Sequence, residues 1–150
     1  MRLFMRVVLD TNVVISGLLW KGVPSDILAL AQEGRITVCV SADNIVELKE
    51  TLSRPKFRKA LTVTKRSAGE VVNGFLEFAE EHPVARFPSV QIHADPSDDV
   101  FLACAITAGA SYIISGDKHL LKLQRFRGVD ILSASAFLRR FRRKGQRESA

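Results

Sequence analysis

The chain has 150 residues, of which 47% are hydrophobic and 25% charged, and its formal net charge is +6. This length favours one domain with a sizeable core, and the composition excludes a disordered or fibrous chain. The two cysteines, Cys39 and Cys104, exclude a disulfide framework, although one disulfide between them stays open. Both lie in apolar runs, which is typical of small buried residues in a reducing compartment.

Short β-branched runs alternate with helix-like stretches along the whole chain. In chain order the patterns predict a strand at 7–9, helices over 13–20 and 25–33, a strand at 36–40, a helix capped by Ser41, a helix over about 64–81, an edge strand within 84–92, a helix over 100–108, a strand at 111–115, a helix over 118–123, a strand at 129–131 and a terminal helix capped by Ser133. This alternation predicts an α/β domain with a mostly parallel sheet.

No segment reads as a membrane span or a signal peptide. The longest uncharged stretch, Val100 to Gly116, is broken by polar residues and glycine, and it is shorter than the roughly 18–20 apolar residues that a span requires. The N-terminus runs straight into a strand pattern without a cleavage site. We therefore expect a cytoplasmic protein without a membrane partner.

The positive charge is concentrated at the C-terminus. From Arg139 onward there are six basic residues and one acidic residue, so the rest of the chain is nearly neutral. The sequence therefore predicts a domain over 1–138 and a basic arm over 139–150, partly helical or disordered. Such an arm suits a phosphate backbone. The alternative is a solvated helix end, where arginines favour the negative end of the helix dipole.

Two aspartates, Asp10 and Asp117, come directly after predicted buried strands. Ligands of open α/β sheets bind outside the carboxyl ends of the strands, so both acids lie at the edge where chemistry is expected. Either one could instead be a helix N-cap. Two carboxylates about 6 Å apart at an effective dielectric of about 20 repel by about 3 kcal/mol, and a divalent cation relieves that repulsion.

Glu47 and Glu50 lie on about the same side of the helix that follows Ser41, and both could be solvated. Glu47 stands between Val46 and Leu48, two residues of buried type, so we expect it to border the core. Glu50 is expected to be peripheral.

Three acids, Asp95, Asp98 and Asp99, crowd a predicted helix N-terminus. Capping and dipole complementarity explain part of this, but three acids are more than a cap needs. Because neighbours on a helix point about 100° apart, only one of Asp98 and Asp99 is expected to hold a metal.

Polar neighbours of the strand-end acids complete the expected site. Thr11, Asn12 and Ser115 can orient carboxylates or waters. His93 and His119 are expected to be surface residues. An all-oxygen cluster suits Mg²⁺ or Mn²⁺ and not zinc.

In this arrangement the chain resembles the PIN domain family over nearly its whole length. Residues 7–13 resemble the first PIN motif, residues 95–102 with Ala105 the third, and residues 109–118 the fourth. Residues 44–48, with 53–57 after them, are similar to a bacterial subgroup described as toxin components, in which the glutamate matching Glu47 is an active-site acid. Asp98 matches the aspartate of the third motif best, with Asp99 as the alternative.

The resemblance implies a three-layer α/β/α domain with a mostly parallel five-stranded sheet. It also implies a Mg²⁺- or Mn²⁺-dependent endoribonuclease that cleaves single-stranded RNA, often the toxin of a toxin–antitoxin pair and often a homodimer. On this view Asp10, Asp98 and Asp117 hold the metal and Glu47 is a further catalytic acid, supported by Thr11, Asn12, Asp95, Asp99 and Ser115. The expected RNA contacts are Arg139, Arg140, Arg142, Arg143 and Lys144.

Two other classes of function stay open on the sequence. One is a catalytically inactive RNA-binding or protein-interaction module on the same fold. The other is a metal-dependent phosphatase or flap-type DNA nuclease that uses similar carboxylates.

Overall fold

The structure is a computed structural model that describes residues 5–83 and 96–148, with side chains placed for 5–83 and 99–145. The elements, in chain order, are β1 (Met5–Leu9), α1 (Thr11–Leu19), α2 (Val23–Gln32), β2 (Ile36–Val40), α3 (Ala42–Leu52), the 3₁₀ turn η1 (Pro55–Phe57), α4 (Arg58–Thr64), α5 (Ala68–Leu76), β3 (Ala79–Glu81), α6 (Pro96–Ala108), β4 (Tyr112–Ile114), α7 (Lys118–Leu123), β5 (Arg125–Phe126), β6 (Val129–Leu132) and α8 (Ala134–Glu148). The edge strand predicted within 84–92 lies outside the described residues.

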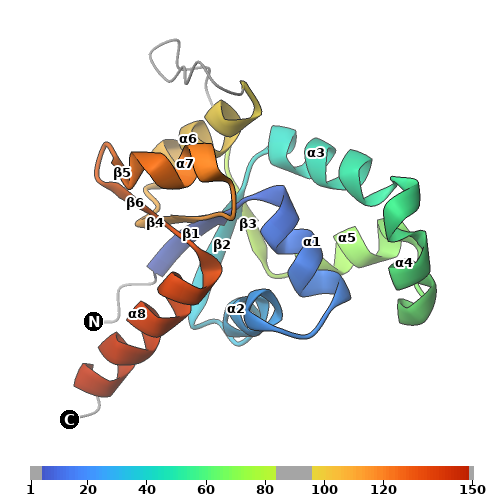
Figure 1. Ribbon diagram of the computed structural model, residues 1–150, viewed down its shortest axis with the longest axis horizontal. Coiled ribbons are helices and arrows are strands. Elements are labelled where there is room, and N and C mark those ends of the chain that lie inside the picture. The colour runs from blue at the N-terminus through green and yellow to red at the C-terminus, as the bar shows by residue number, and fades with distance from the viewer. Residues whose placement is uncertain (1–4, 84–95, 149–150) are drawn as a thin grey trace.

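The strands form one sheet in the order β3-β2-β1-β4-β6-β5 (Figure 1). The first five are parallel to their neighbours, and the two-residue β5 extends the sheet with an antiparallel pair. The mostly parallel α/β fold is therefore confirmed, with six strands in the described residues instead of the five expected. The chain order reverses between β1 and β4, which makes this pair the topological switch point, where open α/β sheets bind ligands.

Helices cover both faces of the sheet, as the three-layer prediction requires (Figure 1). On one face, buried residues of α1, α2, α3, α5 and α8 pack against alternate strand residues such as Val7 and Val38. On the other face, α6 and α7 pack against the intervening residues, including Val8 and Ile113. Strands buried on both faces explain why the sequence shows continuous apolar runs instead of alternation.

Both cysteines are buried on the α6 face and neither forms a disulfide, so the alternative of a disulfide between them is wrong. Burial raises the pKa of Cys39 to about 11 and that of Cys104 to about 12. Both are neutral thiols at physiological pH, in keeping with the prediction of small buried residues.

The helix predicted over about 64–81 is wrong in its extent. Lys65 takes a left-handed conformation (φ 59°) that ends α4. Ser67 then opens α5 with a capping box, because its hydroxyl accepts from the Glu70 amide while the Glu70 carboxylate accepts from the Ser67 amide. After α5, residues 79–81 pair with β2 as the edge strand β3.

The terminal helix α8 begins after Ser133, whose hydroxyl caps it by accepting from the Ala136 amide at 3.2 Å. The helix continues to Glu148, so the predicted basic arm is its second half; the domain boundary at residue 138 stays a prediction. Within the described segments, no helix alone has the length and apolarity to cross a membrane, whereas α1 and α2 pass that test only as a pair bent by 89°.

Candidate active site at the carboxyl edge of the sheet

Asp10 is 5% exposed at the carboxyl end of β1, and its charge is surrounded by neutral donors. Its Oδ1 accepts from the Val13 amide at 3.0 Å, which makes Asp10 the N-cap of α1. Its Oδ2 accepts from the Ser115 hydroxyl and, at 3.3 Å, from the Gly116 amide. A carboxylate can accept about four hydrogen bonds, so these three donors leave Asp10 capacity for a cation.

Asp117 lies beside Asp10 because β4 pairs with β1. The Asp10 amide donates to the Ile114 carbonyl at 3.0 Å, and the Asp117 amide donates to Ser115 Oγ at 2.9 Å. Asp117 caps α7, with Oδ1 accepting from the His119 amide at 2.7 Å and the Leu120 amide at 3.3 Å. Ser115 is therefore a hydroxyl bridge between the two strand ends.

Both aspartates are thus helix caps, the alternative that the sequence left open. The amides that these caps bind are neutral and do not form ion pairs with the carboxylates. Among the residues that the structure describes, neither Asp10 nor Asp117 forms an ion pair with a lysine or arginine. Asp10 Oδ2 and the Asp117 amide both contact Ser115 Oγ, so the two acids lie close together at the switch point, where open α/β sheets bind ligands. Carboxylate oxygens are the ligands that hard divalent cations prefer.

Glu47 lies on α3, which packs against α1, α5 and α6 near the same edge. It is half-buried, whereas Glu50 is exposed, as predicted for both residues. The reasoning from its neighbours was wrong in one respect, since Val46 is 53% exposed and only Leu48 is buried.

The third expected acid belongs to the first turn of α6. This helix begins at Pro96 and packs against β1, β2 and β4 as well as α3. Asp98 and Asp99 both fall in that turn, and Asp99 is half-buried. Asp95 and the Asp98 side chain lie outside what the structure describes, so the choice between Asp98 and Asp99 stays open.

Of the supporting residues, Thr11 is 8% exposed and lies at the start of α1, whereas Asn12 is on the solvent side. Ser115 is fully buried and contacts Asp10 as described, which is the kind of contact proposed for it. His119 is exposed, as expected; His93 lies outside the described residues.

Asn44 is a buried polar residue at this edge that the sequence reasoning did not single out. It forms a capping box with Ser41, in which Oδ1 accepts from the Ser41 amide at 2.9 Å. Its Nδ2 donor is buried without a partner among the described residues, beside a small apolar void that Thr11 and Leu48 also line. A polar residue at the third position of a helix is an ordinary cap signal, so spacing alone could not reveal the unused donor.

The basic second half of α8 lies at the opposite edge of the sheet. Lys144 donates to the Tyr112 hydroxyl at 3.0 Å, and Arg140 stacks over the same ring at 5.7 Å and pairs with Asp130 at 3.2 Å. Together with Arg143 they line a hollow of about 470 Å³. Tyr112 begins β4 and Ser115 follows it, so the two edges are about 10 Å apart along the strand, at about 3.3 Å per residue.

The comparisons with known proteins agree with this geometry. The family model described as "PIN domain" matches residues 6–119, which include the ends of both central strands. VapBC2 from Rickettsia felis, solved bound to a DNA fragment from its promoter, superposes with a TM-score of 0.61 at 15% identity, over 85% of this chain and 97% of that chain. The protein PAE2754 from Pyrobaculum aerophilum superposes with a TM-score of 0.51 at 12% identity, over 91% of this chain and 88% of that chain. No curated protein sequence matches the chain.

The chain belongs to the PIN domain family. At such low identity the two solved structures support the fold and not the activity.

Proposed function

We propose that this protein is a metal-dependent endoribonuclease that cleaves single-stranded RNA. The observation that carries the proposal is Asp10, a buried carboxylate near Asp117 at the switch point, which is held by neutral donors and, within residues 5–83 and 99–145, pairs with no cationic side chain. A buried charge without a counterion is costly, and a site that binds a cation explains why the cost is tolerated.

In this proposal Asp10, Asp98 and Asp117 hold the cation and Glu47 is a further ligand or the base for water. The carboxylate donor set fits Mg²⁺ or Mn²⁺. When bound, such an ion lowers the pKa of a water molecule and neutralises charge that builds up on the phosphate. The chain's own contribution is to fix the carboxylates: Ser115 and the Gly116 amide orient Asp10, and the α7 amides orient Asp117.

The basic half of α8 provides attraction for the RNA backbone without reading its sequence. The arginines and Lys144 of this half lie at the opposite edge of the sheet. Within one protein molecule they therefore contact nucleotides that flank the cleaved bond, and not the scissile phosphate itself. Because β4 is buried, a single strand of RNA has to pass over the surface between the two edges, a path longer than the roughly 10 Å that separates them along β4.

Cleavage of an end-labelled single-stranded RNA tests the proposal directly, with Mg²⁺, Mn²⁺ or EDTA in parallel. Products that appear with either ion, disappear with EDTA and disappear in the Asp10→Asn variant support it. Metal-independent binding without cleavage favours the inactive module. Single-stranded and branched DNA in the same assay, together with a phosphate monoester, distinguish a flap-type nuclease or a phosphatase.

We further propose that the protein is the toxin of a toxin–antitoxin pair and a homodimer. The support is the likeness of residues 44–48 and 53–57 to the toxin-like subgroup and the shared fold with R. felis VapBC2. Expression of the wild-type chain should arrest growth, co-expression of a neighbouring gene product should relieve the arrest, and Asp10→Asn should not cause it. Light scattering of the purified chain tests the dimer.

A further inference from the structure

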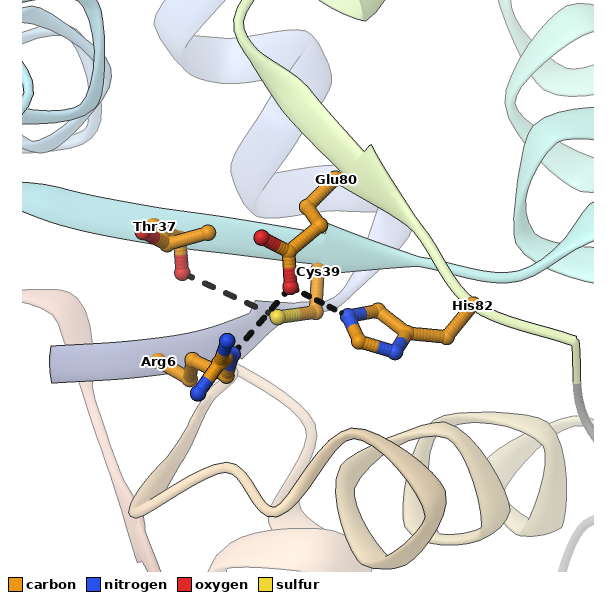
Figure 2. Close-up of polar contacts among 5 residues, drawn as sticks. All are labelled: Arg6, Thr37, Cys39, Glu80 and His82. Atoms are coloured by element: carbon orange, nitrogen blue, oxygen red, sulfur yellow. Dashed lines mark hydrogen bonds and ion pairs between the residues drawn. The ribbon is translucent and has the colours of Figure 1, made fainter. Parts of the chain in front are cut away.

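A second group of metal-type ligands lies at the β3 side of the sheet, apart from the acids at the switch point. Cys39 is on β2, Glu80 is on β3, and His82 follows β3 directly. Their ligand atoms all lie within 4.8 Å of one another (Figure 2). Residues 39 and 82 are far apart in sequence, so no local motif reveals the group.

The sheet itself brings these three side chains together. Cys39 is in register with Glu80 across the parallel β2–β3 pair, so both point to the same face. His82 is two residues beyond Glu80 and therefore shares that face. Its amide donates to the Val40 carbonyl at 2.8 Å, which fixes its backbone against the end of β2. The three ligands are thus placed by backbone hydrogen bonds and not by flexible loops.

The side chains have the burial expected of a partly open metal site. Residue Cys39 is 1% exposed, and the described hydrogen bond of its thiol is a long one, 4.0 Å to the Thr37 carbonyl. Side-chain exposure is 21% for His82 and 41% for Glu80, so the group has a solvent side. His82 also lines a surface hollow of about 450 Å³, which gives an ion a path in.

Without a metal, the same residues form a polar cluster. Arg6 Nε lies 3.1 Å from Glu80 Oε1, and His82 Nε2 lies 2.5 Å from the same oxygen (Figure 2). Both contacts use Oε1, so Oε2 takes part in neither. An exposed pair of this kind contributes little to stability, and it gives no reason for a buried thiol beside the carboxylate and the imidazole.

We propose that Cys39, Glu80 and His82 form a zinc-binding site that fastens the edge strand β3 to β2. Thiolate, imidazole and carboxylate are the three ligand types of zinc, with Zn–S of about 2.3 Å and Zn–N and Zn–O of about 2.0–2.2 Å, and a water molecule takes the fourth position. Tetrahedral ligands at these lengths are about 3.5 Å apart, so the contact between His82 Nε2 and Glu80 Oε1 lengthens by about 1 Å as both turn toward the ion. Any wider pair, up to 4.8 Å, closes by about the same amount. The thiol proton passes to solvent as the Zn–S bond forms, and no atom changes oxidation state.

The site is independent of the proposed nuclease chemistry, because it shares no residue with the acidic edge. Its ligand set prefers zinc or cobalt, whereas the carboxylates prefer Mg²⁺ or Mn²⁺. A metal bound at the acidic edge alone produces no thiolate bond, which gives the test a signature of its own.

Cobalt titration of the full chain, freed of metal with a chelator, tests the proposal. The wild type should bind one equivalent of Co²⁺ with the near-ultraviolet absorption of a cobalt–thiolate bond, and Zn²⁺ should abolish that absorption. Cys39→Ser should remove the band and His82→Gln should weaken binding at least about tenfold. Cys104→Ser, the matched buried thiol, and Asp10→Asn, at the acidic edge, should retain the band.

A melting experiment keeps the proposal testable if Cys39→Ser does not fold. Zn²⁺ should raise Tm with metal concentration in the wild type, and the rise should be clearly smaller in His82→Gln, at a half-exposed position where the substitution is expected to fold. No cobalt–thiolate band and no Tm shift in the wild type overturn the site, and so does a band that persists in Cys39→Ser or disappears in Cys104→Ser.

Discussion

The two edges of the sheet treat their acidic residues in opposite ways. At the carboxyl edge, Asp10 is buried and accepts from two amides and a hydroxyl, all neutral. At the amino edge, Asp130 lies 3.2 Å from Arg140 and 3.7 Å from Arg125. The negative charge of Asp130 is therefore paired with arginine, whereas no lysine or arginine that the structure describes pairs with Asp10.

This difference distinguishes an acid that stabilises the fold from an acid that can bind a ligand. An acid that only stabilises the fold is best paired with arginine, whose guanidinium forms strong hydrogen bonds to carboxylates. Neutral donors fix the position of a carboxylate while its charge stays available to a ligand. Substitutions at the two edges test whether each carboxylate has the role that its contacts indicate.

The largest effect is expected from Asp10→Asn. The amide still caps α1, because asparagine is as good an N-cap as aspartate, but the charge that holds the cation is lost. RNA cleavage should fall at least about 100-fold, as measured by initial rates on a labelled single strand. Asp26→Asn in the first turn of α2, an exposed acid, is the matched control. A variant rate close to wild type would contradict the role of Asp10.

Neutralising the basic half of α8 should weaken RNA binding without affecting the acidic edge. If this half and its rim contact about four phosphates of a single strand, log K falls with log salt at a slope of about −3, or about 60-fold between 50 and 200 mM. Glutamine at Arg139, Arg142, Arg143 and Lys144 should bring the slope close to zero. Arg140 is left in place because it pairs with Asp130.

Binding is measured by fluorescence anisotropy in EDTA, where no cleavage is expected. Glutamine at Lys49 and Lys59, exposed lysines of α3 and α4, is the control and should keep most of the slope. A wild-type slope of log K against log salt near zero would show that the basic half of α8 does not contact the RNA.

Ser115→Ala should destabilise the fold by about 1–3 kcal/mol, the cost of leaving buried polar groups without a partner. The Ser115 hydroxyl donates to Asp10 and accepts from the Asp117 amide, so the substitution affects both strand ends. Urea unfolding measures the change. Ser111→Ala, an exposed serine just before the other end of β4, should change stability by less than about 0.5 kcal/mol. Equal losses in the two variants would show that the bridge contributes nothing.

The smallest effect concerns Tyr112, the single tyrosine of the chain. Burial acts to raise its pKa, but hydrogen bonds and charge from Lys144 and Arg140 outweigh burial and hold the pKa below 10.0. The unfolded chain therefore binds more protons between the two pKa values, and the free energy of unfolding rises with pH in that window. Ultraviolet titration of the phenolate measures the pKa directly.

Lys144→Gln should move the phenol pKa upward, whereas Arg143→Gln, which also lines the hollow but is not among the causes of the shift, should not. A wild-type pKa at or above 10.0 would show that α8 does not pack against Tyr112 in solution.

The sequence predicted the parts of the fold that depend on local pattern. Apolar runs predicted β1, β2, β4 and β6, and Ser41 and Ser133 marked the starts of helices correctly. The prediction of one helix over 64–81 was wrong because Lys65 occupies a left-handed conformation, which lysine rarely adopts. The two-residue β5 is too short to show a period.

The sequence predicted only part of the site, because it shows where strands end but not how they pair. Strand-end position selected Asp10 and Asp117, since parallel strands end at one edge. The register of the strands was not readable, so the hydroxyl bridge through Ser115, the unused donor of Asn44 and the meeting of Cys39 with His82 could not be derived. The place of the basic arm at the opposite edge likewise follows from the direction of α8 and not from its composition.

The most direct test of the central claim is a crystal structure of the full chain soaked in Mn²⁺, with anomalous scattering used to locate the ion. We expect an Mn²⁺ ion at the carboxyl edge, coordinated by the carboxylates of Asp10 and Asp117 and absent from Asp10→Asn crystals. No ion at this edge at millimolar Mn²⁺, or a lysine or arginine side chain occupying its place between the two aspartates, would contradict the claim.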